Sequence, residues 1–271
     1  MANRALLLGT LVTSQTSCCT HATDTSNDDG IVAETVALHL SATPVNRVNQ
    51  NFASFNVDSS YNRGFFHVNF SNPNLRAAAK SLTPATLRFG GSGNDYLHYE
   101  VDYCNASIDD GDYYGCLNTS HWNDFHGLTS EAGLDFLFGI SYDLATACSR
   151  NLSTPYVWDH TPALKLVQYA RDAGQQLWGF ELGNEVNNRG SGGHTFCNVT
   201  PAEQASAFES FYYNVVATVY PKEADRPVIV GPDTGYLNAP TWLKGFFSAR
   251  DLIPSPFPMH AVTHHVYVVS A

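Results

Sequence analysis

The sequence predicts an α/β fold, a (β/α)8 barrel of the TIM type of which about six of the eight strands are present. Two observations lead to this prediction. Short apolar segments alternate with segments of helical periodicity, which is typical of a parallel sheet. Most of the apolar segments also end in polar residues, as expected where strand carboxyl ends build a site. A doubly wound sheet is the alternative, but no GxGxxG motif follows the first strand.

Six strands are expected, and their ends carry the polar residues. The first ends at Asp58, the second stops at the glycines 90 and 91, and the fourth leads into Gly183-Asn184-Glu185. The expected strands cover residues 52–58, 86–91, 134–140, 177–182, 227–231 and 261–267.

Helices are expected between these strands, at residues 74–80, 163–173 and 242–249. The clearest helix start is Thr200-Pro201, with Glu203 three residues after the threonine. This spacing predicts a capping box with proline in the first helical position. A short apolar segment at 37–40 is compatible with an additional N-terminal β-segment beside the barrel.

The N-terminus has the features of a signal peptide, predicted over residues 1–22. Arg4 precedes a short apolar run at 5–12, and small and polar residues follow. The alternative is an apolar N-terminus without this role. A flexible polar stretch is expected over 23–33, and the partial barrel over 34–271. No other stretch approaches the roughly 20 apolar residues of a membrane span.

Glycosylation and disulfide bonding are expected if the chain enters an oxidising compartment. Asn-x-Ser/Thr sequences occur at Asn69, Asn105, Asn118, Asn151 and Asn198. Beyond the predicted signal peptide the cysteines are Cys104, Cys116, Cys148 and Cys197, which allow three pairings. We favour a local Cys104–Cys116 bridge; free buried thiols are the alternative. The predicted location is extracellular or a lysosome-like compartment.

The charge balance excludes some partners. The net charge is −11, and the 14 lysines and arginines are scattered. Binding of nucleic acid or another polyanion requires a basic face. We therefore expect no nucleic-acid partner, and a highly sulfated polysaccharide is disfavoured.

Glu185 is the strongest candidate for a catalytic residue. Glycoside hydrolysis requires a carboxylic acid that protonates the leaving oxygen and, in retaining enzymes, a second carboxylate about 5 Å away. Asn184, just before the acid, is placed to bind the sugar 2-hydroxyl. Any one of the other polar strand ends has an ordinary structural explanation, such as a helix cap for Asp58 or a core histidine for His264. Their convergence on one face favours a site.

The sequence resembles the heparanase-like enzymes of glycoside hydrolase family 79. The segments that carry the resemblance are 52–58, 82–91, 134–139, 181–185, 231–233 and 262–265, in matching order and spacing over 34–267. The resemblance implies a β-glucuronidase fold, retaining chemistry, a glucuronic-acid-containing glycan as substrate, and neither a metal nor another cofactor. It implies Glu185 as acid/base, with Asn184, Asp58, Ser92, His264 and Tyr267 as substrate-binding residues.

The sequence also departs from this family. The nucleophilic glutamate of the family lies on strand seven, whereas the expected strands here end with the sixth, so we expect a fragment that lacks the nucleophile. Val186 and Val266 replace a proline and an aromatic residue common in relatives. Residues 108–113 are acidic where heparanase is basic, which favours a less charged glucuronide. Association with a membrane periphery or the matrix, and the oligomeric state, stay open.

Two alternative functions remain. One is a non-catalytic carbohydrate-binding protein that keeps the sugar subsite. The other is a metal-dependent hydrolase using His264, His265, Asp233 and Glu185, which is weak because neighbouring residues of a strand point to opposite faces.

One structural hypothesis concerns Arg88 and Glu181. These residues lie on the second and fourth strands, and alternate strands share layers inside such barrels. We therefore expect a buried Arg88–Glu181 ion pair.

Overall fold

A computed structural model describes residues 47–59, 68–101, 115–151, 153–190, 199–236 and 238–266. The predicted signal peptide, the polar stretch 23–33, the segment 37–40 and Tyr267 lie outside these residues. The chain divides into Met1–Arg47 and a compact unit, Val48–Ala271. The fold below is that of the compact unit.

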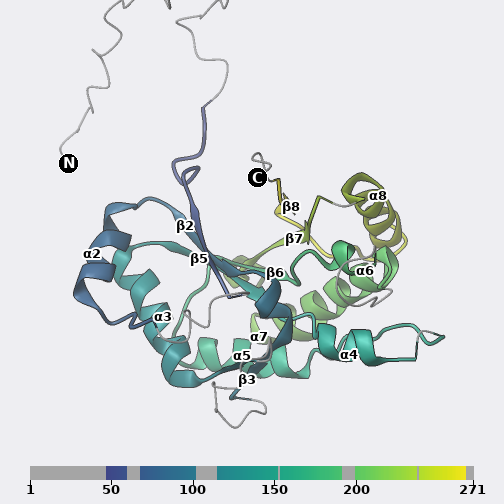
Figure 1. Ribbon diagram of the computed structural model, residues 1–271, viewed down its shortest axis with the longest axis horizontal. Helices are drawn as coiled ribbons and strands as arrows, with labels where there is room; N and C mark the ends of the chain where they lie inside the picture. The colour runs from purple at the N-terminus through teal and green to yellow at the C-terminus, as the bar shows by residue number, and fades with distance from the viewer. Residues whose placement is uncertain are drawn as a thin grey trace, which may run out of the picture. The chain divides into compact units, whose positions relative to one another are not determined.

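In the described residues, six parallel strands form one curled sheet in the order β1-β2-β5-β6-β7-β8 (Figure 1). Each crossover to the next strand of the sheet contains a helix, as in a (β/α) barrel. This sheet is part of such a barrel, and the predicted fold class is confirmed. The strands are β1 (Phe55–Asp58), β2 (Thr86–Gly90), β5 (Asp135–Ile140), β6 (Gly179–Leu182), β7 (Val228–Thr234) and β8 (Ala261–His264).

The helices follow the prediction less completely. α2 (Pro73–Ser81), α5 (Thr161–Asp172), α6 (Pro201–Ser210) and α8 (Ala239–Arg250) correspond to expected helices. The segment between β2 and β5 contains elements that were not expected: β3 (Leu97–Tyr99), β4 (Gly115–Leu117) and α3 (Thr119–Ala132). The remaining short elements are α4 (Leu144–Ser149), α7 (Ala217–Val219), η1 (Ser92–Tyr96), η2 (Val186–Gly190), η3 (Phe211–Val216) and η4 (Glu223–Asp225).

The start of α6 confirms the predicted capping box. Thr200 Oγ1 accepts a hydrogen bond from the Glu203 amide at 3.2 Å, and Glu203 Oε2 accepts from the Thr200 amide at 2.7 Å. The other oxygen of Glu203 accepts from the Tyr156 amide and pairs with Arg150, at 2.6 and 3.1 Å. The cap therefore also holds the loop that precedes α5.

An aromatic cluster packs beneath β2 and β5 and fixes these strands. The rings of Phe89 and Phe138 stack with centroids 5.2 Å apart, and Trp122 of α3 meets Phe138 edge-on at 5.0 Å. All three side chains are buried. Such aromatic pairs contribute about 0.5–1.5 kcal/mol beyond their burial. Within the described residues, no helix is long and apolar enough to cross a membrane.

Part of the predicted disulfide and glycosylation sites can be located. Cys116 and Cys148 are each disulfide-bonded; Cys104 and Cys197 lie outside the described residues, so the pairing stays a prediction. Asn69 and Asn151 are exposed, and Asn118 caps α3 by accepting from the His121 amide at 2.7 Å. Asn105 and Asn198 lie outside the described residues, and glycosylation at the five positions stays a prediction.

Candidate active site

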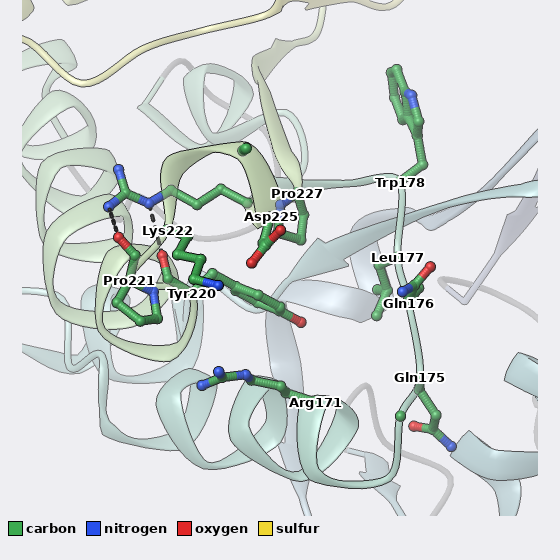
Figure 2. A pocket seen from close by; sticks show the side chains of 13 residues that line it. Arg171, Gln175, Gln176, Leu177, Trp178, Tyr220, Pro221, Lys222, Asp225 and Pro227 are labelled. Atoms are coloured by element: carbon green, nitrogen blue, oxygen red, sulfur yellow. Dashed lines mark hydrogen bonds between the residues drawn. The ribbon is translucent and has the colours of Figure 1, made fainter.

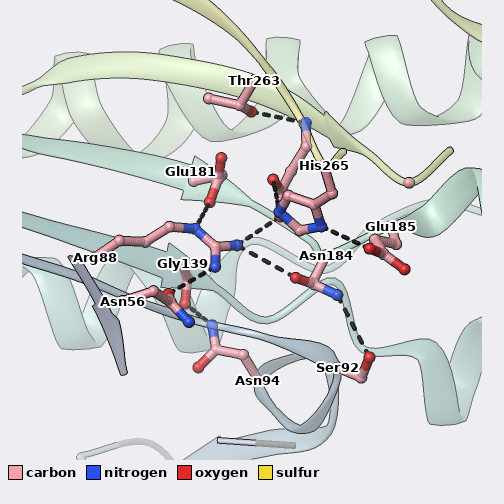
Figure 3. Close-up of polar contacts among 12 residues, drawn as sticks. Asn56, Arg88, Ser92, Asn94, Gly139, Glu181, Asn184, Glu185, Thr263 and His265 are labelled. Atoms are coloured by element: carbon pink, nitrogen blue, oxygen red, sulfur yellow. Dashed lines mark hydrogen bonds and ion pairs between the residues drawn. The ribbon is translucent and has the colours of Figure 1, made fainter. Parts of the chain in front are cut away.

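The carboxyl ends of five strands bring polar side chains together at one end of the sheet (Figure 3). β1 contributes Asn56, β2 contributes Arg88, β6 contributes Glu181, β7 contributes Asp233, and His265 directly follows β8. This convergence is the one expected for a (β/α) barrel.

Arg88 lies at the centre of this group, and all three of its nitrogens are bound. Its Nε donates to Glu181 Oε2 at 2.6 Å, so the structure contains the ion pair expected from the sequence. Its Nη2 donates to Asp233 Oδ2 at 2.6 Å and to Asn184 Oδ1 at 3.2 Å. Its Nη1 donates to Asn56 Oδ1 at 2.8 Å. Arg88 on β2 therefore connects to residues of β1, β6 and β7.

The two carboxylates bound by Arg88 are withdrawn from water: Glu181 is 0% and Asp233 1% exposed. Burial raises the pKa of Glu181 to about 7, and the nearby Asp233 charge adds to this, while Arg88 opposes it. Burial alone would lower the pKa of Arg88, but Glu181 and Asp233 raise it above its ordinary value. The guanidinium therefore stays charged, and Glu181 depends on it to ionise.

His265 links the Arg88 group to Glu185. Its Nδ1 lies 2.6 Å from Glu185 Oε1, and its Nε2 lies 2.7 Å from Asp233 Oδ1. Hydrogen bonds to Asp233 and Glu185 raise the pKa of His265 to about 10 against the opposing effect of burial. At neutral pH the ring is therefore an imidazolium that donates from both nitrogens.

Glu185 is fixed in a strained turn yet stays open to solvent. Its φ is +49°, in the left-handed region, and its amide donates to the Asp233 carbonyl at 2.8 Å. Asn188 Nδ2 donates to its Oε2 at 2.7 Å, while His265 holds Oε1. The side chain is 16% exposed. A fixed carboxylate that reaches solvent is suited to exchanging a proton with a bound ligand.

Asn184 is oriented as a donor toward the region in front of β2. Its Oδ1 accepts from Arg88, which turns Nδ2 toward Ser92 Oγ at 3.4 Å. The backbone amide of Asn184 donates to Oδ2 of the buried Asp95 at 2.9 Å. The structure thus brings Ser92 beside Asn184.

Asp58 lies against the glycine turn that ends β2. Gly91 has a φ of +119°, and a Cβ there would overlap the Asp58 carboxylate. A side chain at Gly90 would meet the Arg88 guanidinium in the same way. The Gly90-Gly91 pair therefore makes room for two polar groups at the site.

The two adjacent histidines have different surroundings in the structure. His264, predicted as a substrate ligand, has its Nδ1 3.0 Å from the Thr234 carbonyl, and the histidine that contacts Glu185 is His265. The pairing of β7 with β8 shifts register between Gly231 and Thr234, so simple alternation does not tell which histidine faces inward. Tyr267, the remaining predicted ligand, lies outside the described residues.

The two acids that Arg88 binds do not fit the role of a nucleophile. Glu181 and Asp233 are fully buried and bound to Arg88. Neither oxygen pair is free to reach a sugar carbon. The described residues also contain no group of three or more His, Cys, Asp or Glu arranged to hold a metal ion.

The model of the N-terminal domain of glycosyl hydrolase family 79 matches residues 27–271. The chain belongs to glycosyl hydrolase family 79. The family 79 match covers the whole of the compact unit and includes every site residue described above.

Curated relatives of this family 79 chain include enzymes that act on glucuronides by name. Baicalin-beta-D-glucuronidase of Scutellaria baicalensis is 24% identical over 88% of this chain and 49% of its own length. Heparanase-like protein 3 of Arabidopsis thaliana is 23% identical over 74% of this chain and 37% of its own. Mouse heparanase is 25% identical over 54% and 34%. The chain thus spans half or less of the length of these relatives.

A separate hollow of about 710 Å³ lies at the other end of the strands (Figure 2). It is lined by residues that precede β6 and β7, including Trp178 and Pro227. One lining cation, Arg226, donates to the carbonyls of Tyr220 and Pro221 at 2.9 and 3.1 Å, so it braces the backbone. Since barrel active sites lie at the carboxyl ends of the strands, this hollow is not part of the family 79 site.

The shifted pKa of His265 predicts a specific pH dependence of stability. The folded-state pKa of about 10 exceeds the ordinary value of 6.5, so the contribution of the imidazolium is complete below pH 6.5 and is lost as the pH rises through about 10. We expect His265→Gln to destabilise the domain at pH 6, with the gap to the wild type closing between pH 6.5 and 10. Urea unfolding across this range measures it; a gap independent of pH would contradict the imidazolium assignment.

Proposed function

We propose that this chain carries the acid/base half of a retaining glycoside hydrolase that cleaves β-linked glucuronides in glycans. The observation that carries the proposal is the environment of Glu185, which follows β6 in a family 79 domain. Its two carboxyl oxygens are bound by His265 and Asn188, and its side chain is open to solvent. In the first step Glu185 gives its proton to the leaving oxygen. In the second step its carboxylate takes a proton from the attacking water.

His265 stabilises the charge that this chemistry creates. When Glu185 gives up its proton, a negative charge develops on its carboxylate. The His265 imidazolium, with Nδ1 2.6 Å from Oε1, lies ready to stabilise that charge without rearrangement. Asp233 on the far ring nitrogen holds the imidazole in place.

Asn184 is the proposed ligand of the sugar 2-hydroxyl. Its Oδ1 is occupied by Arg88, which leaves Nδ2 to donate toward the substrate. Hydrogen bonds to this hydroxyl strengthen as the transition state forms. Asp58 and Ser92 are proposed to line the same subsite.

Retaining chemistry also needs a nucleophilic carboxylate, which we place on a seventh strand, beyond β8, as the family resemblance implies. This placement is supported by the burial of Glu181 and Asp233 in ion pairs with Arg88. Because Arg88 holds both of these acids, a second candidate function is a carbohydrate-binding protein that keeps the sugar subsite without hydrolysis. We further propose that the protein is secreted and glycosylated, since its sequence carries a signal-peptide pattern and five glycosylation sequences.

An assay on an aryl β-glucuronide tests the proposed function. The 271-residue chain is compared with a form extended through the downstream coding sequence. We expect hydrolysis by the extended form only. Hydrolysis by the 271-residue chain would contradict the placement of the nucleophile. If neither form hydrolyses the substrate but both bind glucuronides, the binding function is supported instead.

A further inference from the structure

The segment after β7 is tied to the turn that carries Glu185. The Glu185 amide donates to the Asp233 carbonyl at 2.8 Å. Two residues further on, the buried side chain of Asn187 accepts from the Gly235 amide at 2.8 Å and donates to the Gly235 carbonyl at 3.1 Å. Residues 233–235 therefore have a fixed position relative to residues 185–187.

Asn188 fills the space between Gly235 and Glu185. A Cβ at Gly235 would overlap the Asn188 amide, whose Nδ2 donates to Glu185 Oε2 at 2.7 Å. His265 holds the other oxygen, Oε1. Gly235 thus lies on the Oε2 side of the acid, across from His265.

Tyr236 is the next residue, and it is 65% exposed, whereas residues 229–235 are buried. Among the described residues, it makes neither a hydrogen bond nor a ring contact. The exposed Tyr213 is different, because its hydroxyl donates to the Ser255 carbonyl at 2.6 Å. A single exposed tyrosine is ordinary. Tyr236 is distinguished because it directly follows Gly235, whose backbone is hydrogen-bonded to Asn187 in the turn after Glu185.

The strand order tells on which side of the acid Tyr236 lies. Asn184, just before Glu185, turns its Nδ2 toward Ser92, which follows β2. Tyr236 follows β7, the neighbour of β6 on the opposite side from β2. Asn184 and Tyr236 therefore lie on opposite sides of Glu185 along the order of the strands. The acid protonates the oxygen that joins the sugar to the leaving group. If Asn184 binds the sugar as proposed, the leaving group extends past Glu185 toward the segment that carries Tyr236.

We propose that Tyr236 forms the subsite for the leaving group and selects one with a ring that offers an apolar face, aryl or pyranose. This inference rests on the proposed function and deepens it. An aromatic side chain combines an apolar face with a polar tip and suits a ring that is partly hydrated. The loss of such a contact lowers affinity by roughly three- to tenfold.

The test is a binding titration by NMR with the 271-residue chain, using methyl β-glucuronide, phenyl β-glucuronide and a β-glucuronyl disaccharide. We expect Tyr236→Ala to lower the affinity for phenyl β-glucuronide roughly three- to tenfold and to leave methyl β-glucuronide unchanged. Tyr236→Phe should bind like the wild type, and Tyr213→Ala is the matched control. An equal loss for the disaccharide assigns the subsite to a pyranose as well as an aryl ring.

Two results would overturn the assignment while leaving the proposed function intact. One is unchanged affinity of Tyr236→Ala for all ligands, with methyl β-glucuronide still bound. The other is an equal loss for methyl and phenyl glucuronides, which would give Tyr236 a structural role. Failure of the wild-type chain to bind any glucuronide would overturn the proposed sugar subsite, and this inference with it.

Discussion

Arg88→Met is expected to destabilise the domain by roughly 3–5 kcal/mol, the cost of leaving a buried charge without its partner. Arg88 is the cation that pairs directly with both Glu181 and Asp233, at 2.6 Å in each case. Both acids are fully buried, so water cannot replace the guanidinium. The loss is a large fraction of the roughly 5–15 kcal/mol that stabilises an ordinary domain.

Urea unfolding followed by circular dichroism measures this effect, and Glu131→Gln is the control. Glu131 pairs with Arg76 at the surface and is 59% exposed, so its loss should cost no more than about 1 kcal/mol. The loss of unfolding free energy in Arg88→Met should also be smaller at pH 5, because the buried carboxyls can then take up protons. A deficit no larger than that of Glu131→Gln would show that Arg88 does not hold these charges.

The strands could be predicted because their apolar segments are short, β-rich and followed by glycine or polar residues. The helix α6 was predictable from Thr200, Pro201 and Glu203 alone, because a capping box is a local signal. The expected bounds of β1, β7 and β8 each differ by three residues at one end from those in the structure.

α3 was not predicted, although its signals are present. Asn118 caps its start, and Gly133 ends it in the left-handed conformation. Trp122, Phe125 and Ala132 are buried on one face of this helix, interleaved with polar residues that weaken the periodicity. The short strands β3 and β4 could not be predicted, because three residues carry too little pattern.

Within the site, the Arg88–Glu181 pair followed from the layered packing of a barrel, but the position of His265 did not. The register shift between β7 and β8 changes which of two adjacent histidines faces the acid. From the sequence, Asp233 was named only as part of the alternative metal site; its ion pair with Arg88 depends on a tertiary contact between distant strands. Such contacts leave no local signal in one sequence.

Glu185→Gln should have the largest effect on activity. In the form extended through the nucleophile, we expect kcat for glucuronides with poor leaving groups to fall about 10²- to 10⁴-fold, because the amide cannot donate the required proton. A nitrophenolate leaving group needs no proton and should be much less affected. Steady-state kinetics on a series of aryl β-glucuronides measures this, with Glu131→Gln as a variant that leaves the site intact. An equal loss across the series would contradict a role as general acid.

The most direct test of the central claim, that Glu185 is the acid/base, adds azide to the extended form of Glu185→Ala. Azide attacks a glycosyl-enzyme intermediate without needing a general base, so it should restore turnover of an activated glucuronide and form the β-glucuronyl azide. The wild type should show no such acceleration. Turnover of Glu185→Ala at the wild-type rate, with no azide product, would contradict the assignment of Glu185.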